Sequence, residues 1–177
     1  MIQRKQTIFL ILAACAFAVS FMFPIASFEA KAPLGVPVTG HLRLIAKEVP
    51  ETMSQILNGE PVEIGQRAYV NTWPLIALTI VAALIALGSI FLYKNRVRQM
   101  RVVAVGFLLG VIDIFLVFIW AVDSFVDQAT QAMAGTDVKT TYGIATWAMI
   151  VAIVLMFLAQ RSIKKDEEKV RAADRLR

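Results

Sequence analysis

Four long runs of apolar residues, separated by polar stretches, dominate the pattern along the chain. They are Thr7–Ala26, Leu75–Tyr93, Val102–Val122 and Tyr142–Ala159. Each run approaches the ~17–25 residues that a helix needs to cross a bilayer. The pattern therefore predicts an all-α membrane protein, in which residues 1–177 form a single domain, a bundle of four transmembrane helices.

The beginning of the chain also has features of a secretory signal peptide, because Arg4 and Lys5 precede an apolar centre. The apolar run is long for such a signal. We therefore expect this segment to be retained as the first span.

The stretch between the first two spans, Glu29–Thr72, is the longest segment outside the predicted membrane. His41–Val49 and Pro61–Val70 alternate as short strands do, on either side of Asn58-Gly59. Between them, Glu51–Leu57 could form two helical turns. We expect a small strand-containing extracytoplasmic cap in this first outer loop. Because an isolated hairpin is marginal in water, the cap should lean on the bundle or on a partner.

The third run carries a carboxylate, Asp113, near its middle. At ~1.5 Å per residue, Asp113 lies ~16 Å from Val102, close to the centre of a ~30 Å hydrocarbon core. Gly106 and Gly110 form a GxxxG motif, and Asp113 follows Gly110 by one further helical step. The two glycines and the carboxylate therefore share one helix face, which we expect to meet protein.

Two roles for Asp113 are open from the sequence. Intramembrane carboxylates often mark proton or cation pathways. A protonated carboxyl group can instead hydrogen-bond to a neighbouring helix, where Thr79, Ser89 or Thr146 offers a hydroxyl. We favour the structural or subunit-contact role, because transporters usually show broken helices, internal repeats or several polar groups at this depth.

Small residues predict packing faces on two other spans. Ala82, Ala86 and Ser89 follow i, i+4 and i+7 in the second span, and Ala148 and Ala152 form a small-xxx-small pair in the fourth. The basic link between the second and third spans is short, so these two spans should form a tight antiparallel hairpin.

Composition and charge agree with this layout. Apolar residues make up 58% of the chain, against roughly 45–50% in soluble domains, and the mean hydropathy is +0.68. Of the 18 Lys and Arg residues, 13 precede the first span, link the second to the third or follow the fourth. The positive-inside rule then places both termini in the cytoplasm, and Glu29–Thr72 and Asp123–Thr141 outside. The net charge of +5 thus reflects topology, and we expect no nucleic-acid partner.

The chain offers few residues for catalysis or cofactor binding. Cys15 is the only cysteine, which excludes a quinone-linked disulfide oxidoreductase, and His41 is the only histidine, which excludes a bis-histidine haem bundle. His41 with Glu48 or Glu51 could bind a metal, but a solvated loop histidine is the simpler interpretation. The sequence has no phosphate-cradling Gly-rich loop, no HExxH and no nucleophile elbow. We expect no enzymatic activity, no cofactor and no metal.

The polar end of the chain, Arg161–Arg177, mixes acidic and basic residues and predicts a cytoplasmic helical tail. Anionic lipid attracts Lys and Arg, but acidic residues work against that attraction, so lipid alone does not explain the mixture. We expect the tail to pack against the link Lys94–Arg101 and the N-terminal Met1–Gln6. The alternative is a solvated helix with only local pairs such as Glu167 with Arg171.

This packing would create a cytoplasmic interaction face, in which acidic residues of the tail pair with basic residues of the other two segments. Its members are Arg4, Lys94, Arg96, Arg98, Asp166, Glu167, Asp174 and Arg175.

Three stretches resemble a known family. They are the start Met1-Ile2-Gln3-Arg4-Lys5-Gln6-Thr7, the link Tyr93-Lys94-Asn95-Arg96-Val97-Arg98-Gln99, and the end, with Ile163-Lys164-Lys165-Asp166-Glu167, Val170-Arg171 and Asp174-Arg175-Leu176-Arg177. Together they are similar to an uncharacterised family of small four-span membrane proteins of the Bacteroidetes, a domain of unknown function. The resemblance implies an inner-membrane location and no particular reaction. The loop layout is also similar to that of claudin-like proteins, but the tryptophan and paired cysteines of the claudin first loop are absent.

The function that these features favour is that of a non-enzymatic accessory or scaffold subunit of an envelope complex in a bacterial inner membrane. Its partners would be the lipid bilayer and a membrane protein, or further copies of the chain. The alternative is a small proton-coupled transporter that uses Asp113.

Overall fold

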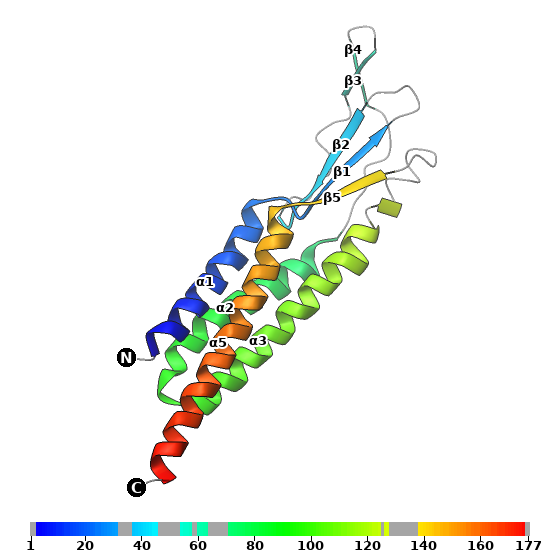
Figure 1. Ribbon diagram of the computed structural model, residues 1–177. Coiled ribbons are helices and arrows are strands. Elements are labelled where there is room, and N and C mark those ends of the chain that lie inside the picture. Colours follow the sequence, from blue (N-terminus) through cyan, green and yellow to red (C-terminus); the bar gives the residue numbers. More distant parts are fainter. Residues whose placement is uncertain are drawn as a thin grey trace. The chain divides into compact units, whose positions relative to one another are not determined.

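The computed structural model describes residues 3–31, 37–45, 54–57, 60–63, 71–124, 126–127 and 138–175 (Figure 1). The chain divides into two compact units. The helical unit consists of Met1–Val19, Ala77–Ile114 and Ala148–Arg177. The sheet unit consists of Ser20–Ile76 and Phe115–Trp147.

Long helices carry the apolar runs. They are α1 (Gln3–Met22), α2 (Trp73–Phe91), α3 (Arg96–Leu116) and α5 (Ile144–Arg175). A 3-10 turn, η1 (Leu92–Lys94), follows α2, and a π-helical segment, η2 (Val117–Val122), continues α3. In the described part of the chain, four stretches are long and apolar enough to cross a membrane: Lys5–Met22, Trp73–Lys94, Arg96–Val122 and Ile144–Ala172. The prediction of a mainly helical chain with four such stretches is confirmed.

The helix ends differ from the predicted ones for local reasons. Helix α1 ends at Met22, because Pro24 cannot donate a backbone hydrogen bond and Ala26 already begins a strand. Helix α5 begins at Ile144, two residues later than predicted, because Tyr142 belongs to a strand. It then continues to Arg175, so the predicted helical tail is a direct extension of the fourth helix.

The link between α2 and α3 is shorter than predicted. Only Asn95 separates η1 from α3, and the Gln99 amide donates the first helical hydrogen bond to the Asn95 carbonyl, at 2.9 Å. The segment 96–101, predicted to be part of a link, therefore forms the first turns of α3 and carries its basic side chains on a helix.

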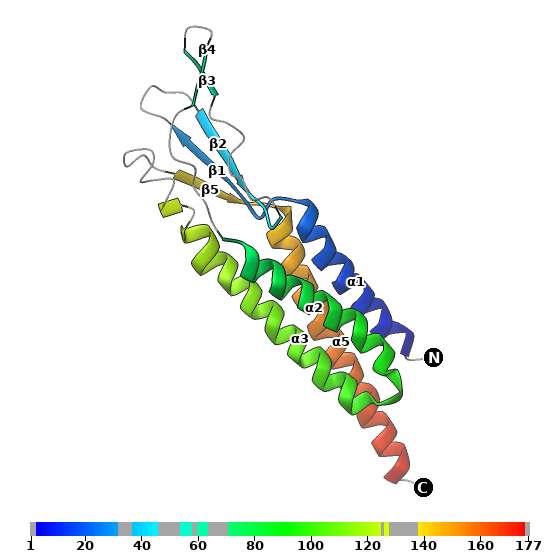
Figure 2. The ribbon, with the colours of Figure 1, turned by 180° about the vertical axis from the view of Figure 1, so that it is seen from behind.

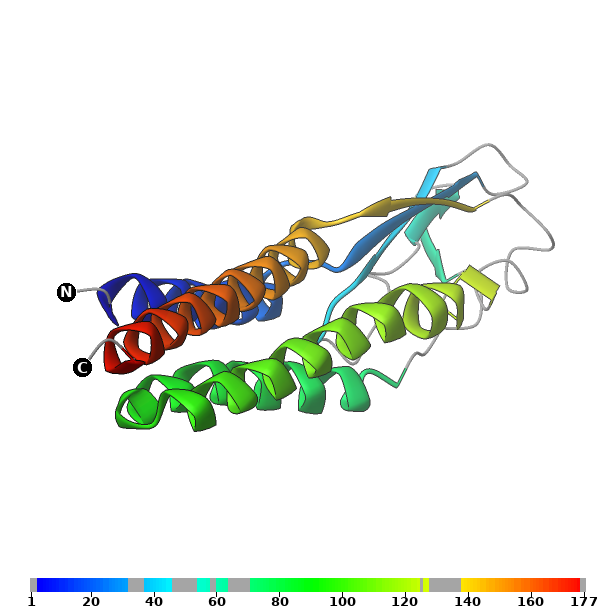
Figure 3. The same cartoon turned by 60° about the horizontal axis from the view of Figure 1, so that its bottom comes forward.

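The four helical segments of the helical unit run side by side (Figures 2 and 3). Their core is apolar and contains small residues where the helices approach each other, with contributions from every helix: Leu10, Ala13, Phe17, Ala82, Ala86, Val103, Ala152, Met156, Ala159 and Ile163. The Phe107 and Phe157 rings of α3 and α5 pack with their centroids 6.0 Å apart. The predicted packing residues Ala82, Ala86 and Ser89 are all fully buried.

The sheet unit contains a three-stranded antiparallel sheet in the order β2-β1-β5. Its strands are β1 (Ala26–Lys31), β2 (Pro37–Leu42) and β5 (Val138–Tyr142). On β1, Ala26 and Phe28 are buried, whereas Ser27 lies opposite both His41 of β2 and Thr141 of β5. This alternation gives the sheet one apolar and one polar face.

The strands of the expected cap come in part from other segments of the chain than predicted. The prediction confined it to the first outer loop, but β5 comes from the segment between α3 and α5 and pairs with β1. The predicted strand His41–Val49 overlaps only the end of β2, and its residues 46–49 lie outside the described part of the chain. The register with β1 explains the earlier start of β2, because Lys31 is opposite Pro37.

A separate hairpin consists of β3 (Ser54–Leu57) and β4 (Glu60–Glu63). The predicted helix over Glu51–Leu57 is wrong at residues 54–57, which form a strand paired with β4. An Asn-Gly pair joins the two strands in the sequence, and this dipeptide favours two-residue hairpin loops. The rest of the predicted strand Pro61–Val70 lies outside the described residues beyond Glu63.

Backbone hydrogen bonds within the sheet unit tie the end of α1 to the beginning of α5. The amides of Gly143 and Ala145 donate to the carbonyls of Ile25 and Pro24, at 2.7 and 3.2 Å. The Thr146 hydroxyl donates to the Ile25 carbonyl at 2.7 Å, so this carbonyl has two donors. A Cβ atom at position 143 would lie 2.2 Å from the Pro24 carbonyl oxygen, so this contact requires glycine.

Candidate functional site

Helix α3 presents one buried stripe to the interior of the helical unit. Its buried residues are Gln99, Val103, Gly106, Gly110 and Asp113. They recur every three or four positions, which places them on one helix face. The two glycines and the carboxylate thus lie together on the face that meets the other helices.

The two glycines on this stripe allow close helix contact. A Cβ atom at Gly106 would lie 2.5 Å from the Met156 methyl carbon of α5 and 2.7 Å from Ile85 Cγ2 of α2. A Cβ atom at Gly110 would lie 3.0 Å from Ile153 Cγ1 of α5. Because these distances are shorter than ordinary carbon contacts, side chains from neighbouring helices occupy the space that glycine leaves.

Asp113 is bonded to a second buried polar residue. The Thr79 hydroxyl of α2 donates to Asp113 Oδ2 at 2.6 Å, and the side chains are 0% and 1% exposed, respectively. Asp113 Oδ1 is buried and has no hydrogen-bond partner among the described residues. The carboxyl group is therefore satisfied on one oxygen only.

Of the three hydroxyls that could have reached Asp113, only that of Thr79 bonds to it. Ser89 donates to the Ala86 carbonyl in its own helix at 2.7 Å, and Thr146 donates to Ile25. Helices α2 and α3 are antiparallel, so their residues pair in opposite order along the interface. One turn from the Thr79 and Asp113 pair, the interface continues with Ala82 and Gly110, both buried.

No cationic side chain lies in the apolar parts of the other helices. Residues 7–22, 73–91 and 144–160 contain no Asp, Glu, Lys or Arg. The charge that Asp113 would carry as a carboxylate therefore has no counter-ion within these three stretches, and the hydrogen bond that stabilises it comes from Thr79.

A second polar cluster lies where the beginning of α1, the beginning of α3 and the tail of α5 meet. We call this part of the helical unit, residues 5–6, 92–101 and 160–172, the basic end. Gln6 Nε2 of α1 donates to Asp166 Oδ2 of α5, and both side chains are buried. The Arg96 guanidinium of α3 donates to the Asp166 backbone carbonyl at 3.4 Å. Asp166 thus connects the tail to both segments against which it was predicted to pack, but its carboxylate bonds to the neutral Gln6 and not, as predicted, to a basic side chain.

The other predicted members of the cytoplasmic face are arranged differently. Glu167 pairs with Arg171 one turn further along α5, at 3.0 Å, and not with the basic residues of α3. The reason is geometric, since residues four apart lie next to each other on a helix. Lys94 and Arg98 are exposed. The side chains of Arg4, Asp174 and Arg175 lie outside the described part of the structure.

The candidate metal ligand His41 lies on β2, where it is exposed. Its Nδ1 lies 3.0 Å from the Ser27 hydroxyl of β1, and the suggested partners Glu48 and Glu51 lie outside the described residues. Within the described residues, no group of three or more His, Cys, Asp or Glu side chains comes together. Cys15 is exposed on α1.

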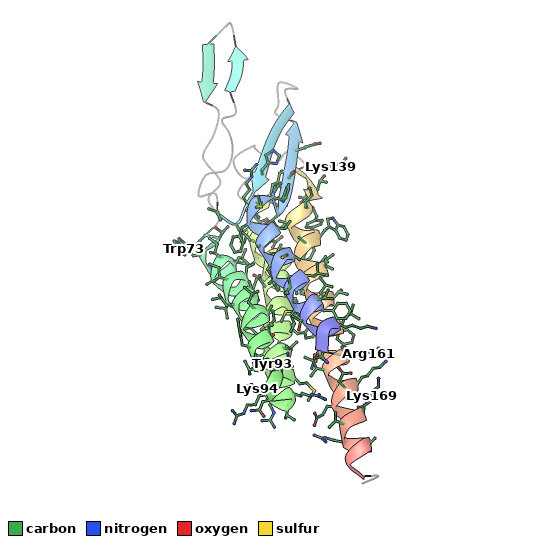
Figure 4. All side chains as sticks on the ribbon, turned by 90° about the vertical axis from the view of Figure 1, so that its left-hand side faces the viewer. Trp73, Tyr93, Lys94, Lys139, Arg161 and Lys169 are labelled. Atoms are coloured by element: carbon green, nitrogen blue, oxygen red, sulfur yellow. The ribbon has the colours of Figure 1, made fainter. Side chains whose placement is uncertain are left out.

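Aromatic and basic residues mark the two ends of the second apolar stretch. Trp73 begins α2, and Tyr93 and Lys94 end the η1 turn that follows it (Figure 4). The 22 residues from Trp73 to Lys94 correspond to ~33 Å of helix. Both aromatic side chains are largely exposed.

The role of Gln6 could not be predicted from the sequence. The segment Met1–Gln6 was predicted to pack against the tail through its basic residues, but the buried bond to Asp166 comes from the neutral Gln6 and joins residues 160 positions apart. The same holds for Thr146, whose partner is a backbone carbonyl in a distant segment.

Comparison with known proteins shows the family of this chain. Residues 2–176 match the family model described as Domain of unknown function (DUF4293), and the chain therefore belongs to this family. The predicted membership of a domain family of unknown function is confirmed. No curated protein matches the sequence.

Proposed function

We propose that this member of the DUF4293 family is a non-enzymatic accessory or scaffold subunit of an envelope complex. In this proposal the four candidate stretches all cross the inner membrane of a bacterium of the Bacteroidetes, with both termini in the cytoplasm. The Bacteroidetes origin rests on the three family-like motifs at the start, the link and the end of the chain.

The surface of the long helices supports insertion into a bilayer. Large apolar side chains are exposed on each of the four, including Ile11, Leu84, Leu108 and Val154. In water such a surface would drive association, because monomeric soluble proteins rarely expose contiguous apolar patches above a few hundred Å². In a bilayer the same side chains contact acyl chains.

The distribution of charge supports the orientation. The residues of the basic end lie at the start of the first candidate stretch, at the end of the second, at the start of the third and at the end of the fourth. Lys and Arg next to short loops favour the cytoplasmic side. The β-strands would then lie outside the cytoplasm.

The observation that carries the scaffold proposal is the connection of the basic end by Asp166. Its carboxylate bonds to Gln6 and its carbonyl accepts from Arg96, so three chain segments that are distant in the sequence are held together. Lipid attraction needs basic residues but no buried acidic connection of this kind. Lys94 and Arg98 are exposed on either side of Arg96, which contacts the tail, and a partner protein could recognise these basic side chains.

Purification from native membranes tests this proposal. The full chain, carrying an affinity tag, is isolated in mild detergent, and the co-purifying proteins are compared with those of a Lys94→Gln/Arg98→Gln variant. We expect the wild-type chain to co-purify with a membrane protein that the variant does not retain, although both chains are present in the membrane at the same level. The matched control is Lys139→Gln, an exposed lysine on β5, which should retain the partner. Purification of the chain without any partner, or with one that both variants retain equally, would contradict the proposal.

The alternative function is a small proton-coupled transporter that uses Asp113, and the buried, half-satisfied carboxyl group favours it. The glycines beside it argue against a pathway at this depth, since side chains of α1, α2 and α5 closely approach them. Proton-linked flux in proteoliposomes distinguishes the two functions. If Asp113→Asn abolished such a flux without disturbing assembly, the transporter would replace the scaffold.

A further inference from the structure

The scaffold function leaves one buried group without a role, the carboxyl group of Asp113. A carboxylate in the interior of a helical bundle is costly, because low-dielectric surroundings replace water. A structural contact between α2 and α3 would need only two hydroxyl-bearing or apolar side chains. The carboxyl group adds an oxygen, Oδ1, that has no partner in the described part of the chain.

The surroundings of Asp113 contain no group that would hold a permanent charge. Helix α2 contributes the neutral Thr79 hydroxyl, and α1, α2 and α5 contribute no Asp, Glu, Lys or Arg within residues 7–22, 73–91 and 144–160. The one titratable side chain within these three stretches is the Cys15 thiol, which is exposed. Along α3 the nearest charged residues are Arg101 and Asp123, at least ten positions away in the sequence.

The identity of the partner to Asp113 matters. A threonine hydroxyl can donate a hydrogen bond and can also accept one. In the structure the Thr79 hydroxyl donates to Asp113 Oδ2, and the two oxygens are 2.6 Å apart. If the carboxyl group is protonated, the hydroxyl can rotate its O–H bond and accept from the carboxyl O–H at the same separation. An Arg, Lys or backbone N–H partner could only donate, and would serve the charged form alone.

The number of oxygen atoms decides which cation this pair can bind. Thr79 and Asp113 together supply three side-chain oxygens, whereas Ca²⁺ takes six to eight oxygen ligands and Mg²⁺ demands octahedral coordination. Among the described residues, Asp113 belongs to no group of three or more His, Cys, Asp or Glu side chains, and residues 7–22, 73–91 and 144–160 contain no Asp, Glu or His. A proton needs a single oxygen.

We propose that Asp113 is a reversible proton-binding site, in which the carboxyl group exchanges one proton while its hydrogen bond to Thr79 is kept in both states. The site joins α2 to α3 beside the close contacts of Gly106 and Gly110. It goes beyond the scaffold function, and its protonation can be measured without knowledge of any partner.

Infrared difference spectroscopy of the full chain in lipid bilayers tests the site. Spectra recorded at stepwise different pH should contain the carbonyl stretch of a protonated carboxyl group that disappears as the pH is raised. In Asp113→Asn this band should be missing, whereas Asp123→Asn, the same change at an exposed carboxylate that follows the same helix, should retain it. A native-like elution profile and helix content show that each variant is folded.

Two Thr79 variants keep the test decisive even if Asp113→Asn fails to fold. Thr79→Val removes the hydroxyl at similar volume and should shift the band, because the carboxyl group loses its hydrogen bond. Thr79→Ser keeps the hydroxyl and should leave the band where it is in the wild type.

Three results would overturn the site. The first is the absence of the band at every pH at which the chain is folded. The second is a band that does not change with pH, since this would be a permanently neutral structural group. The third is a band that neither Asp113→Asn nor Thr79→Val alters.

Discussion

The Gln6 side chain of α1 donates a hydrogen bond to the Asp166 carboxylate of α5, and thereby joins the two ends of the chain inside the helical unit. Both side chains are buried, so neither can exchange its partner for water. Removing only one partner of a buried hydrogen bond costs the most stability, because the other polar group is left buried without a partner.

Gln6→Ala should therefore destabilise the protein by ~1–3 kcal/mol, because it leaves the buried Asp166 carboxylate without its amide donor. Thermal unfolding in detergent, followed by circular dichroism, measures the loss. Glu167→Gln is the matched control, since it removes a partner of the exposed Arg171 and should cost less than ~1 kcal/mol. Equal losses in the two variants would mean that the Gln6 bond contributes no more than a surface pair.

Gly106→Ala should destabilise the protein by ~1–3 kcal/mol, because its methyl group would overlap Met156 and Ile85. The control lies on the neighbouring helix. A Cβ atom at Gly88 of α2 would meet nothing within 4 Å, so Gly88→Ala should be neutral or stabilise the helix by up to ~1 kcal/mol. Unfolding of both variants under the same conditions gives the comparison, and a stable Gly106→Ala protein would contradict the close packing of α3.

Gly143→Ala tests the connection between the end of α1 and the beginning of α5. The new methyl group would collide with the Pro24 carbonyl oxygen, and relief of the collision would break the hydrogen bond from the Gly143 amide to Ile25. We expect a loss of ~1–3 kcal/mol, again from thermal unfolding. Thr146→Val removes one donor to the same Ile25 carbonyl and should cost less, because the backbone donor remains. A larger loss of stability in Thr146→Val than in Gly143→Ala would contradict the close contact between Gly143 and Pro24.

Much of the helical unit could be predicted because its signals are local. The spacing of Gly106, Gly110 and Asp113 defines a helix face without reference to any other segment, and this face is buried. The sequence offers three hydroxyl-bearing residues as partners of Asp113, namely Thr79, Ser89 and Thr146, and does not indicate which of them forms the hydrogen bond. That choice depends on the register of α2 against α3, which sequence periodicity does not specify.

The sheet was harder to predict because its pairing is non-local. In β1, Ala26 and Phe28 alternate with Ser27 and Glu29, but this short pattern directly follows an apolar run, and the predicted first span therefore includes Ala26. Its partner β5 lies more than a hundred residues further along the chain. At Ser54–Leu57 the apolar spacing fits a helix, and pairing with β4 overrides it, as strand formation depends on neighbours more than on intrinsic preference.

We propose that the chain spans the membrane with its basic end in the cytoplasm and its strands outside. The most direct measurement is cysteine labelling in intact cells, in a Cys15→Ala background, with single cysteines at Arg98 and at Lys139, both exposed positions. An impermeant thiol reagent should label Lys139→Cys and leave Arg98→Cys unlabelled until the cells are opened. Labelling of Arg98→Cys in intact cells, under conditions that leave a cytoplasmic control protein unlabelled, would contradict the claim.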